Sequence, residues 1–399
     1  MMLSVRAPLS RGLIGALAVS LAVAAAALAA PGGIQFLGAV VDGVDGADGL
    51  DGAYGLAVSP DDEHLYAITD SENSIVTLER IGGGALSFTS MESQGVDGVD
   101  GMQSPSAVAM APDGDHVYVA ASTGHSLVTF SRDVGSGELT YEGHLVDDVD
   151  GVDGLGSPCC QISVSPDGRH LYVAASGDSA VGVFDLDEDT GEPSFKQVLV
   201  DGVDGVDGLS GAIGVTVAPN GRAVYATGNG DDAVVAFKRR GNGMLEFLNA
   251  RFDDVGPVRG MMGPCCSVAV SPDGRNVYVP TSDDDSIVAF KRAKKSGKLQ
   301  FLRAYFNGKR GIEDMDEPLD VVVAPDGRDA YAAGYLSHSV ARFARKRDGL
   351  LSFKRASVDG TGGIENLEGS WRLAIPSNGR NVYSAAYDDD AVVAFKRLR

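Results

Sequence analysis

Residues 165–174 read SPDGRHLYVA, and this phrase decides the fold because it recurs along the chain. Seven copies align on one turn position, which falls at Asp62, Gly114, Gly168, Gly221, Gly274, Gly327 and Gly379. Successive copies lie 52 to 54 residues apart. A fixed period near 50 residues is typical of propellers and solenoids, so the sequence predicts a repeat protein.

Each repeat is predicted to contain four short strands. In the third repeat they cover Gln161–Ser165, His170–Ala175, Ala180–Leu186 and Pro193–Val200, with Pro-Asp-Gly between the first two. Gly168 supplies the positive φ that such a tight turn requires. Four antiparallel strands per repeat make one propeller blade. We therefore predict an all-β, seven-bladed β-propeller.

The seventh repeat lacks its outer strand, because the final segment, Ala391–Arg399, aligns with the third strands of the other repeats. Ile34–Val41 reads IQFLGAVV and matches the fourth-strand segments LEFLNARF and LQFLRAYF. We expect this N-terminal strand to pair into the seventh blade, which closes the ring and removes an exposed sheet edge. The propeller is then predicted to cover residues 34–399.

Residues 1–29 have the features of a secretory signal peptide. Arg6 and Arg11 form a basic segment, Leu13–Ala27 is an apolar run, and small residues mark a cleavage position near Ala29. The apolar run is shorter than the roughly 20 residues that a membrane span needs. We expect an exported protein, periplasmic or extracellular, with a short linker at residues 30–33 and no membrane span.

The longer stretch SPDGRHLYVAASGDSAVGVF, residues 165–184, resembles the bacterial YVTN-type, lactonase-like seven-bladed propellers, which share the 6-phosphogluconolactonase-like fold. The resemblance covers nearly all of the chain after the signal peptide. It rests on turn and strand residues. It therefore implies the fold, and it implies a lactonase-like activity as an expectation.

The formal net charge is −22, and loss of two signal-peptide arginines would leave about −24. Such a chain repels nucleic acid and anionic lipid, and it attracts cations. Aspartates gather in the links between blades and in the turns between second and third strands, which share one face of a propeller. We call this the acidic face; basic residues such as Lys291 and Lys346 fall on the opposite face. We expect a monomer that meets a small molecule or a protein or cell-surface partner at the acidic face, and no nucleic acid.

Closely spaced aspartates on a glycine-rich backbone suit Ca²⁺, which takes several oxygen ligands. The candidate ligands are Asp147, Asp150, Asp153, Asp201, Asp204, Asp207, Asp283 and Asp285. The spacing of three within the links differs from the alternate-residue spacing of an EF-hand loop. The alternative interpretation is a solvated acidic rim that keeps the protein soluble.

Four cysteines form two adjacent pairs, Cys159-Cys160 and Cys265-Cys266, at equivalent positions of the third and fifth repeats. A whole blade separates the pairs, so a bridge between them would exceed the roughly 7 Å Cα separation that a disulfide tolerates. We predict two vicinal disulfides formed in an oxidising compartment. A four-thiolate zinc site is the alternative, which the same distance and the absence of CxxC spacing disfavour.

The repeats differ most where the first strand begins, near the expected mouth of the central channel. Trp371, Tyr54 and one cysteine of each pair share that position, and the residues after it include Arg372, Asp320 and Gln161. A varied ring at a channel mouth predicts a small binding site. In the structural alternative, Arg372 pairs with Asp320 of the adjoining blade and Trp371 packs as core.

Three functions stay open at this point. The first is a non-catalytic binding or interaction protein with an acidic face that binds Ca²⁺. The second, implied by the resemblance, is a lactone hydrolase or cyclase. A neutral lactone is favoured, because an acidic face repels phosphate. A metal-bound water would open it, with Arg372 to polarise the carbonyl and Asp320 as base. The third, a quinone-cofactor dehydrogenase, rests on the adjacent cysteines alone, and the single tryptophan and seven repeats disfavour it.

Overall fold

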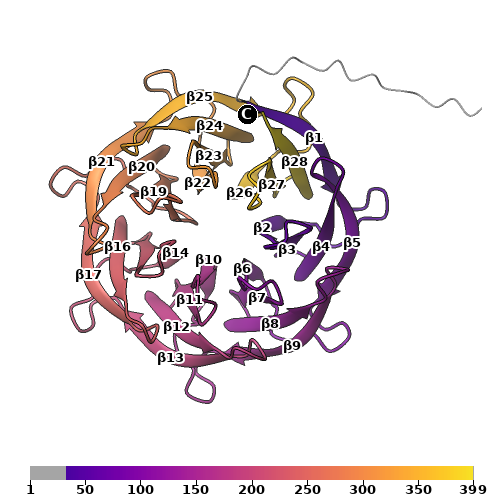
Figure 1. Cartoon of the computed structure of the whole chain (residues 1–399), viewed down its shortest axis with the longest axis horizontal. Coiled ribbons are helices and arrows are strands. Elements are labelled where there is room, and N and C mark those ends of the chain that lie inside the picture. Colours follow the sequence, from indigo (N-terminus) through magenta and orange to yellow (C-terminus); the bar gives the residue numbers. More distant parts are fainter. Residues whose placement is uncertain (1–32, 399) are drawn as a thin grey trace, which may run out of the picture.

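Seven antiparallel sheets stand as blades around a central axis in the computed structural model, which describes residues 33–398 (Figure 1). Each sheet has four strands, so the predicted seven-bladed propeller is confirmed. Within a blade the strands follow one another from the channel to the rim (Figure 1). The predicted signal peptide at residues 1–29 lies outside the described residues.

The first four blades each use four consecutive strands. Blade one contains β2 (Ala53–Val58), β3 (His64–Thr69), β4 (Ser74–Ile81) and β5 (Ala85–Ser93). Blade two contains β6 (Pro105–Met110), β7 (His116–Ala121), β8 (Ser126–Arg132) and β9 (Leu139–Val146). Blade three contains β10 (Pro158–Val164), β11 (His170–Ala175), β12 (Ala180–Leu186) and β13 (Pro193–Val200). Blade four contains β14 (Ala212–Val217), β15 (Ala223–Gly228), β16 (Ala233–Arg239) and β17 (Leu245–Phe252).

The last three blades complete the circle. Blade five contains β18 (Ala269–Val270), β19 (Asn276–Thr281), β20 (Ser286–Arg292) and β21 (Leu299–Phe306). Blade six contains β22 (Pro318–Val323), β23 (Asp329–Gly334), β24 (Ser339–Arg345) and β25 (Leu351–Val358). Blade seven contains β26 (Ser370–Ala374), β27 (Asn381–Ala386) and β28 (Ala391–Arg397), with β1 (Ile34–Val41) as its outer strand.

The ring is closed by β1, as the sequence predicts. It pairs antiparallel with β28, from Ile34 opposite Arg397 to Val41 opposite Ala391. A register shift after Phe36 places Gly38 at a φ of 141°, a conformation that suits glycine. The outer edge of the third strand of blade seven is therefore paired with a segment from the other end of the chain.

The core lies between neighbouring blades. Each large cluster of buried side chains combines residues from two adjacent sheets; one of them joins Tyr172 of blade three to Val215 and Phe237 of blade four. The second-strand tyrosines of all seven repeats are fully buried, so they are packing residues. A third-strand phenylalanine packs edge-on against the fourth-strand aromatic, as Phe184 does with Phe195 at 6.0 Å between ring centroids.

Candidate functional site

The mouth of the channel on the acidic face is built from irregularities in the first strands. In most blades the pairing between first and second strand skips one residue, for example Tyr54 between Ala53 and Gly55, and Trp371 between Ser370 and Arg372. A β-bulge of this kind re-aims the extra side chain. The bulged residues Tyr54, Ile213, Leu319 and Trp371 lie in one cluster with Cys160 and Cys266, which occupy irregular segments of blades three and five, and this cluster plugs the channel.

Four aromatic rings form the exposed part of this plug, and all are half-buried. Trp371 lies at the centre, with ring centroids 4.9 Å from Tyr54, 5.0 Å from Tyr335 and 5.4 Å from Tyr387. The Tyr335 hydroxyl donates to Asp388 and the Tyr387 hydroxyl donates to Asp70. The mouth is thus an aromatic platform bordered by carboxylates, a surface suited to stacking against a flat ligand.

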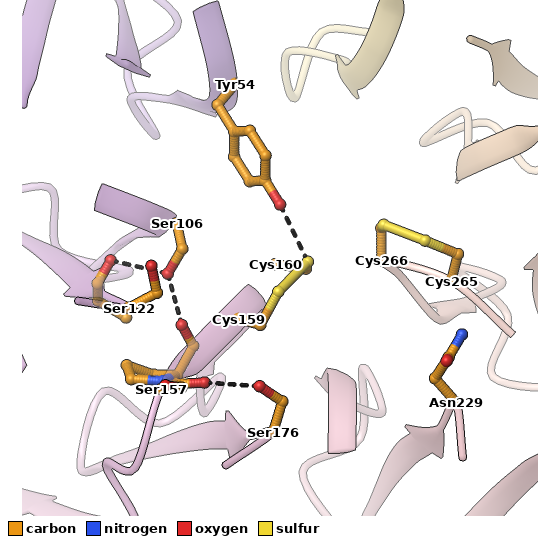
Figure 2. The surroundings of a disulfide bond; sticks show 12 residues. Tyr54, Ser106, Ser122, Ser157, Cys159, Cys160, Ser176, Asn229, Cys265 and Cys266 are labelled. Carbon is orange, nitrogen blue, oxygen red and sulfur yellow. Dashed lines mark hydrogen bonds between the residues drawn. A yellow bond between two sulfur atoms is a disulfide. The ribbon is translucent and has the colours of Figure 1, made fainter. Parts of the chain in front are cut away.

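Two vicinal disulfides, Cys159–Cys160 and Cys265–Cys266, complete the plug, as predicted. Figure 2 shows the hydroxyl of Tyr54 pointing at Cys160, with the second disulfide beside the first. The oxygen lies 3.1 Å from Cys160 Sγ. Burial raises the pKa of Tyr54 to about 12, so the phenol stays protonated.

Arg372 and Asp320 lie on the channel side of the plug and are almost fully buried. The Arg372 guanidinium donates to the backbone carbonyls of Cys160 and Cys266, which ties blades three, five and seven together. Its Nη1 also lies 3.8 Å from Asp320 Oδ1, so the two residues pair between adjoining blades. Asp320 Oδ2 accepts the backbone N–H of Leu373 at 2.8 Å.

A cavity of about 330 Å³ extends along the channel from this pair. Its lining begins at Cys160, Gln161 and Arg372 and continues to Val323 and Ile375, near the far ends of the first strands. It therefore runs from the plug toward the opposite face. Gln161 Oε1 accepts the N–H of Val268 at 3.0 Å, which fixes its side chain at the cavity wall.

The first polar residue of every link has one structural role. In all seven links a side-chain oxygen of this residue accepts the backbone N–H eight residues later, as in Asp147 to Leu155 and Asp201 to Leu209, both at 2.9 Å. Gln94 and Asn307 make the same bond in their links. The link therefore requires a hydrogen-bond acceptor at this position, but the acceptor does not have to be charged.

The aspartate three residues after the first one in a link is favoured by the backbone conformation at its position. Asp150 and Asp204 have φ values of 51°, in the left-handed region that aspartate tolerates better than most residues. Asp285 also has a positive φ, of 47°, and its carboxylate accepts the N–H of Glu317 at 2.7 Å. Asp283 accepts only the Ser282 hydroxyl at 3.2 Å among the hydrogen bonds of the described residues. None of these four candidate metal ligands belongs to a group of three close carboxylates among the described residues.

Three links do bring carboxylates together, each in a triad whose oxygens lie within 4.8 Å of one another. We call these groups the carboxylate triads; they are Asp42–Asp48–Glu72, Asp147–Asp153–Asp178 and Asp201–Asp207–Asp231. Burial and the nearby carboxylate of Asp178 raise the pKa of Asp147, and burial and Asp42 raise the pKa of Glu72. Concentrated negative charge of this kind could hold a metal ion.

Sequence reasoning did not select Tyr335 and Tyr387, although both contact Trp371. They follow directly after β23 and β27, at a repeat position filled by Asp70, Ser122, Ser176, Asn229 and Ser282 in the other blades. Two aromatic residues at a position that is otherwise small and polar were the available signal. The third member of each carboxylate triad, such as Asp178, comes from a different turn, so no local spacing could reveal it.

Within residues 33–398, no helix is long and apolar enough to cross a membrane.

Comparison with solved structures places the fold among lactonase-like propellers. A candidate 6-phosphogluconolactonase from Bacteroides uniformis has a TM-score of 0.62 at 20% identity, over 81% of this chain and 88% of that one. The periplasmic gluconolactonase of Pseudomonas aeruginosa has a TM-score of 0.62 at 21% identity, over 83% and 93%. Hydrazine synthase from Kuenenia stuttgartiensis has a TM-score of 0.63 at 17% identity, over 90% and 100%. These similarities concern the fold alone.

An uncharacterized protein from Staphylococcus aureus is 23% identical over 184 residues, which are 45% of this chain. The chain spans about half the length of this curated relative, 47%. The family model described as "Lactonase, 7-bladed beta-propeller" matches residues 50–148 and 161–313, which is more than half of the chain. The protein therefore belongs to the seven-bladed β-propeller lactonase family.

Proposed function

We propose that this protein is a lactonase-type hydrolase that opens a small uncharged lactone in the channel cavity. The observation that carries the proposal is the Arg372–Asp320 pair, which borders a cavity of about 330 Å³ on the inner side of the plug. Membership of the lactonase family supports the reaction class. The cavity has room for a small ring and a water molecule.

Arg372 would stabilise the negative charge that develops on the lactone carbonyl oxygen. A guanidinium has five N–H donors, and the hydrogen bonds to Cys160 and Cys266 use two of them. The remaining donors can bind an oxyanion in a site with little water, where such contacts are strong.

Asp320 would act as general base through Oδ1, since its Oδ2 is held by the Leu373 amide. The carboxylate takes a proton from water as the water oxygen bonds to the lactone carbonyl carbon. The ring C–O bond then breaks, and the leaving alkoxide takes the proton from Asp320. One lactone and one water give one hydroxy acid, and the residues return to their starting state.

The substrate is proposed to be uncharged because the cavity offers no excess positive charge. Arg372 and Asp320 are the charged residues of its lining, and they compensate each other. A phosphate group would enter without a free cationic partner and would lose its hydration, which disfavours a phosphorylated lactone.

The proposal is tested by the rate of acid release from a panel of neutral lactones and one phosphorylated lactone. Asp320→Asn keeps the shape of the side chain, and we expect it to lower kcat by at least about 100-fold, as does Arg372→Ala. Because Arg372 also joins three blades, each variant is first compared with the parent protein by thermal melting.

Tyr335→Phe is the matched control, since it changes the outer plug and leaves the cavity lining intact. We expect it to retain turnover. A folded Asp320→Asn variant with full activity, or faster turnover of the phosphorylated lactone than of any neutral one, would contradict the proposal.

We further propose that the protein is exported to the periplasm or the extracellular space and works as a monomer. The composition of residues 1–29 supports export, and the related P. aeruginosa gluconolactonase is periplasmic. N-terminal sequencing of the secreted protein should give a start directly after Ala29, and size-exclusion chromatography with light scattering should give a monomer mass.

A second candidate function is Ca²⁺-dependent binding at the acidic face. The carboxylate triads support it, because they recur at equivalent positions of three blades and hold like charges close together. In the fifth repeat, Arg259 replaces the middle aspartate of the triad. Ca²⁺ at the triads would order the links, and a partner would bind the ordered face.

A further inference from the structure

The two halves of the propeller differ sharply in charge. Residues 34–200, which form β1 and blades one to three, contain 29 Asp and Glu but four Lys and Arg. Residues 201–399 contain 26 Asp and Glu and 27 Lys and Arg. Most acidic residues of the second half lie in its links and in its turns between second and third strands, on the acidic face. Its opposite face is therefore strongly basic, although the whole chain is acidic.

A hollow of about 650 Å³ lies in this basic region, between blades five and six. Five cationic residues line it, of which Arg292 is buried. The other four, Arg275, Lys291, Lys294 and Arg347, are exposed. They come from the two kinds of turn on the opposite face and from the end of β20, so several strands fix their relative positions.

These four residues form no ion pair or side-chain hydrogen bond within the described part of the chain. They differ in this from Arg292 and Arg345, whose guanidinium groups are held by the hydroxyls of Tyr225 and Tyr278. Asp348 is the one carboxylate of the described lining. The hollow thus has an excess of positive charge that the protein does not neutralise.

The charge is not required by the local fold. The turn of blade five that carries Lys294 is closed by Ala293 N to Lys298 O and Gly297 N to Ala293 O. In blade three the equivalent bonds, Asp187 N to Glu192 O and Gly191 N to Asp187 O, close the same turn. That turn reads DEDTGE where blade five has AKKSGK. One turn geometry carries opposite charges, so the positive charge is free to serve a ligand.

We propose that this hollow and its surroundings bind a linear sulfated polysaccharide. Arginine and lysine together suit sulfate ester groups, since the arginine fork can bind two oxygens of one group. Exposed Lys295 and Lys298 of blade five extend the positive surface beyond the hollow, and a polymer can bridge this length. Lys238 and Arg240 of blade four are also exposed, but both pair with Glu246.

The geometry disfavours the other polyanions. No aromatic side chain of the described residues lines the hollow, so nucleic-acid bases would find no stacking partner. A planar anionic membrane that reached blades four to six would also meet Asp113, Asp133 and Glu188 on the same face of blades two and three. Their charge would repel a flat anionic surface, whereas a narrow chain avoids them.

The test is biolayer interferometry with immobilised dextran sulfate, with neutral dextran as the reference polymer. We expect binding to dextran sulfate that weakens steeply as salt rises, and no binding to dextran. The triple variant Lys291→Gln, Lys294→Gln, Arg347→Gln should weaken affinity by about tenfold or more, at about 0.5 kcal/mol for each exposed charge pair. Lactone turnover is not expected to change, because the hollow lies outside the channel.

The matched control removes three exposed charges elsewhere: Lys309→Gln, Arg310→Gln, Lys354→Gln. This control variant has the same net charge as the first triple variant, and it should bind dextran sulfate as tightly as the parent protein does. Equal loss in both triple variants would show that net charge alone sets the binding and would overturn the proposal. The same holds if a single-stranded oligonucleotide or anionic phospholipid vesicles bind as tightly as dextran sulfate.

Discussion

Arg132 Nε donates a hydrogen bond of 2.7 Å to the hydroxyl of Tyr66, across the border between blades one and two. That hydroxyl in turn donates to the carbonyl of Gly137 at 2.8 Å. The arginine recurs at this position in six repeats; the exception is Leu186, so Tyr118 lacks an arginine partner. These buried contacts join each blade to the next one.

Arg132→Ala should lower the stability of the propeller. The Arg132 side chain is 1% exposed and bonds Tyr66, Asp61 and the Gly114 carbonyl, so its loss leaves buried polar groups without a partner. We expect a decrease of about 2–4 kcal/mol in the free energy of unfolding. Arg169→Ala, which removes an exposed pair with Glu188, should change it by less than about 0.5 kcal/mol. Urea denaturation measures both; a similar effect of the two changes would contradict the role of the buried contacts.

The ionised side chain of Asp167 should stabilise the folded protein, and protonation of this side chain in acid should remove that stabilisation. Burial alone would raise the pKa of Asp167, but hydrogen bonds from Ser165 and Arg239 outweigh it and lower the pKa to about 2. Because the carboxylate has a pKa of about 3.9 in the unfolded chain, its contribution is complete above that pH and is lost as the pH falls toward 2. Asp167→Asn should therefore melt lower than the parent protein above pH 4, and the two melting curves should converge near pH 2. A constant difference at all pH values would count against this assignment.

Asp147→Asn should have the opposite effect on thermal stability to Asp167→Asn. Burial and the neighbouring carboxylates raise the pKa of Asp147, so its ionised form is disfavoured in the folded state at neutral pH. Asparagine can still accept the Leu155 amide, as Asn307 does for Met315 in blade six. We expect equal or higher thermal stability at pH 7 in EDTA. A large destabilisation would show that the charge itself is needed in the link.

Ca²⁺ should raise the melting temperature if the carboxylate triads bind it. A ligand that binds only the folded state stabilises it by about 2.7 kcal/mol per site at about 100 times its Kd. The triple change Asp48→Asn, Asp153→Asn, Asp207→Asn should abolish the rise, because it removes one ligand from each triad.

The control for the triads is Asp100→Asn, Glu313→Gln, Glu365→Gln, at the equivalent positions of links that form no triad among the described residues. This variant should respond to Ca²⁺ as the parent protein does. No shift in the parent protein, or an equal loss in both variants, would argue that the acidic face is a solvated rim.

Trp371 should report the redox state of the plug. It is the single tryptophan of the chain and packs in the cluster that contains Cys160 and Cys266. Disulfides quench indole emission at contact, so reduction with dithiothreitol should increase the fluorescence of the folded protein. The variant with all four cysteines changed to serine should be bright from the start and should not respond. Unchanged emission of the parent protein on reduction, with thiols detected by labelling, would contradict the contact.

The repeat pattern was sufficient to predict the fold, because packing forces the same residue types into every blade. Gly168 and Tyr172 have counterparts in the other repeats, and the match of Ile34–Val41 to fourth strands located the closing strand. Vicinal disulfides followed from the one-blade separation of the cysteine pairs. Such inferences succeed where a residue type or a spacing is compatible with only one local structure.

The site was only partly predictable, because one residue type serves several purposes there. The regular spacing of Asp147, Asp150 and Asp153 suggested three equivalent ligands, whereas the structure gives them three roles: an acceptor for a backbone amide, a left-handed turn residue and an exposed carboxylate. The aromatic platform also depends on which turns lie next to Trp371 across blade borders. Which turns become neighbours is decided only when the ring closes, so the sequence of one repeat does not reveal it.

The pairing of β1 with β28 also constrains how the protein is made. During synthesis the chain emerges N-terminal end first, so β1 appears before the strands of the seven blades and β28 appears after six of them. Those six blades can form as their residues emerge, but the seventh waits for β28, and β1 stays without a neighbour through the whole interval. Until β28 appears the chain therefore carries an unpaired strand capable of joining other chains, and the ring closes against such pairing in one late step.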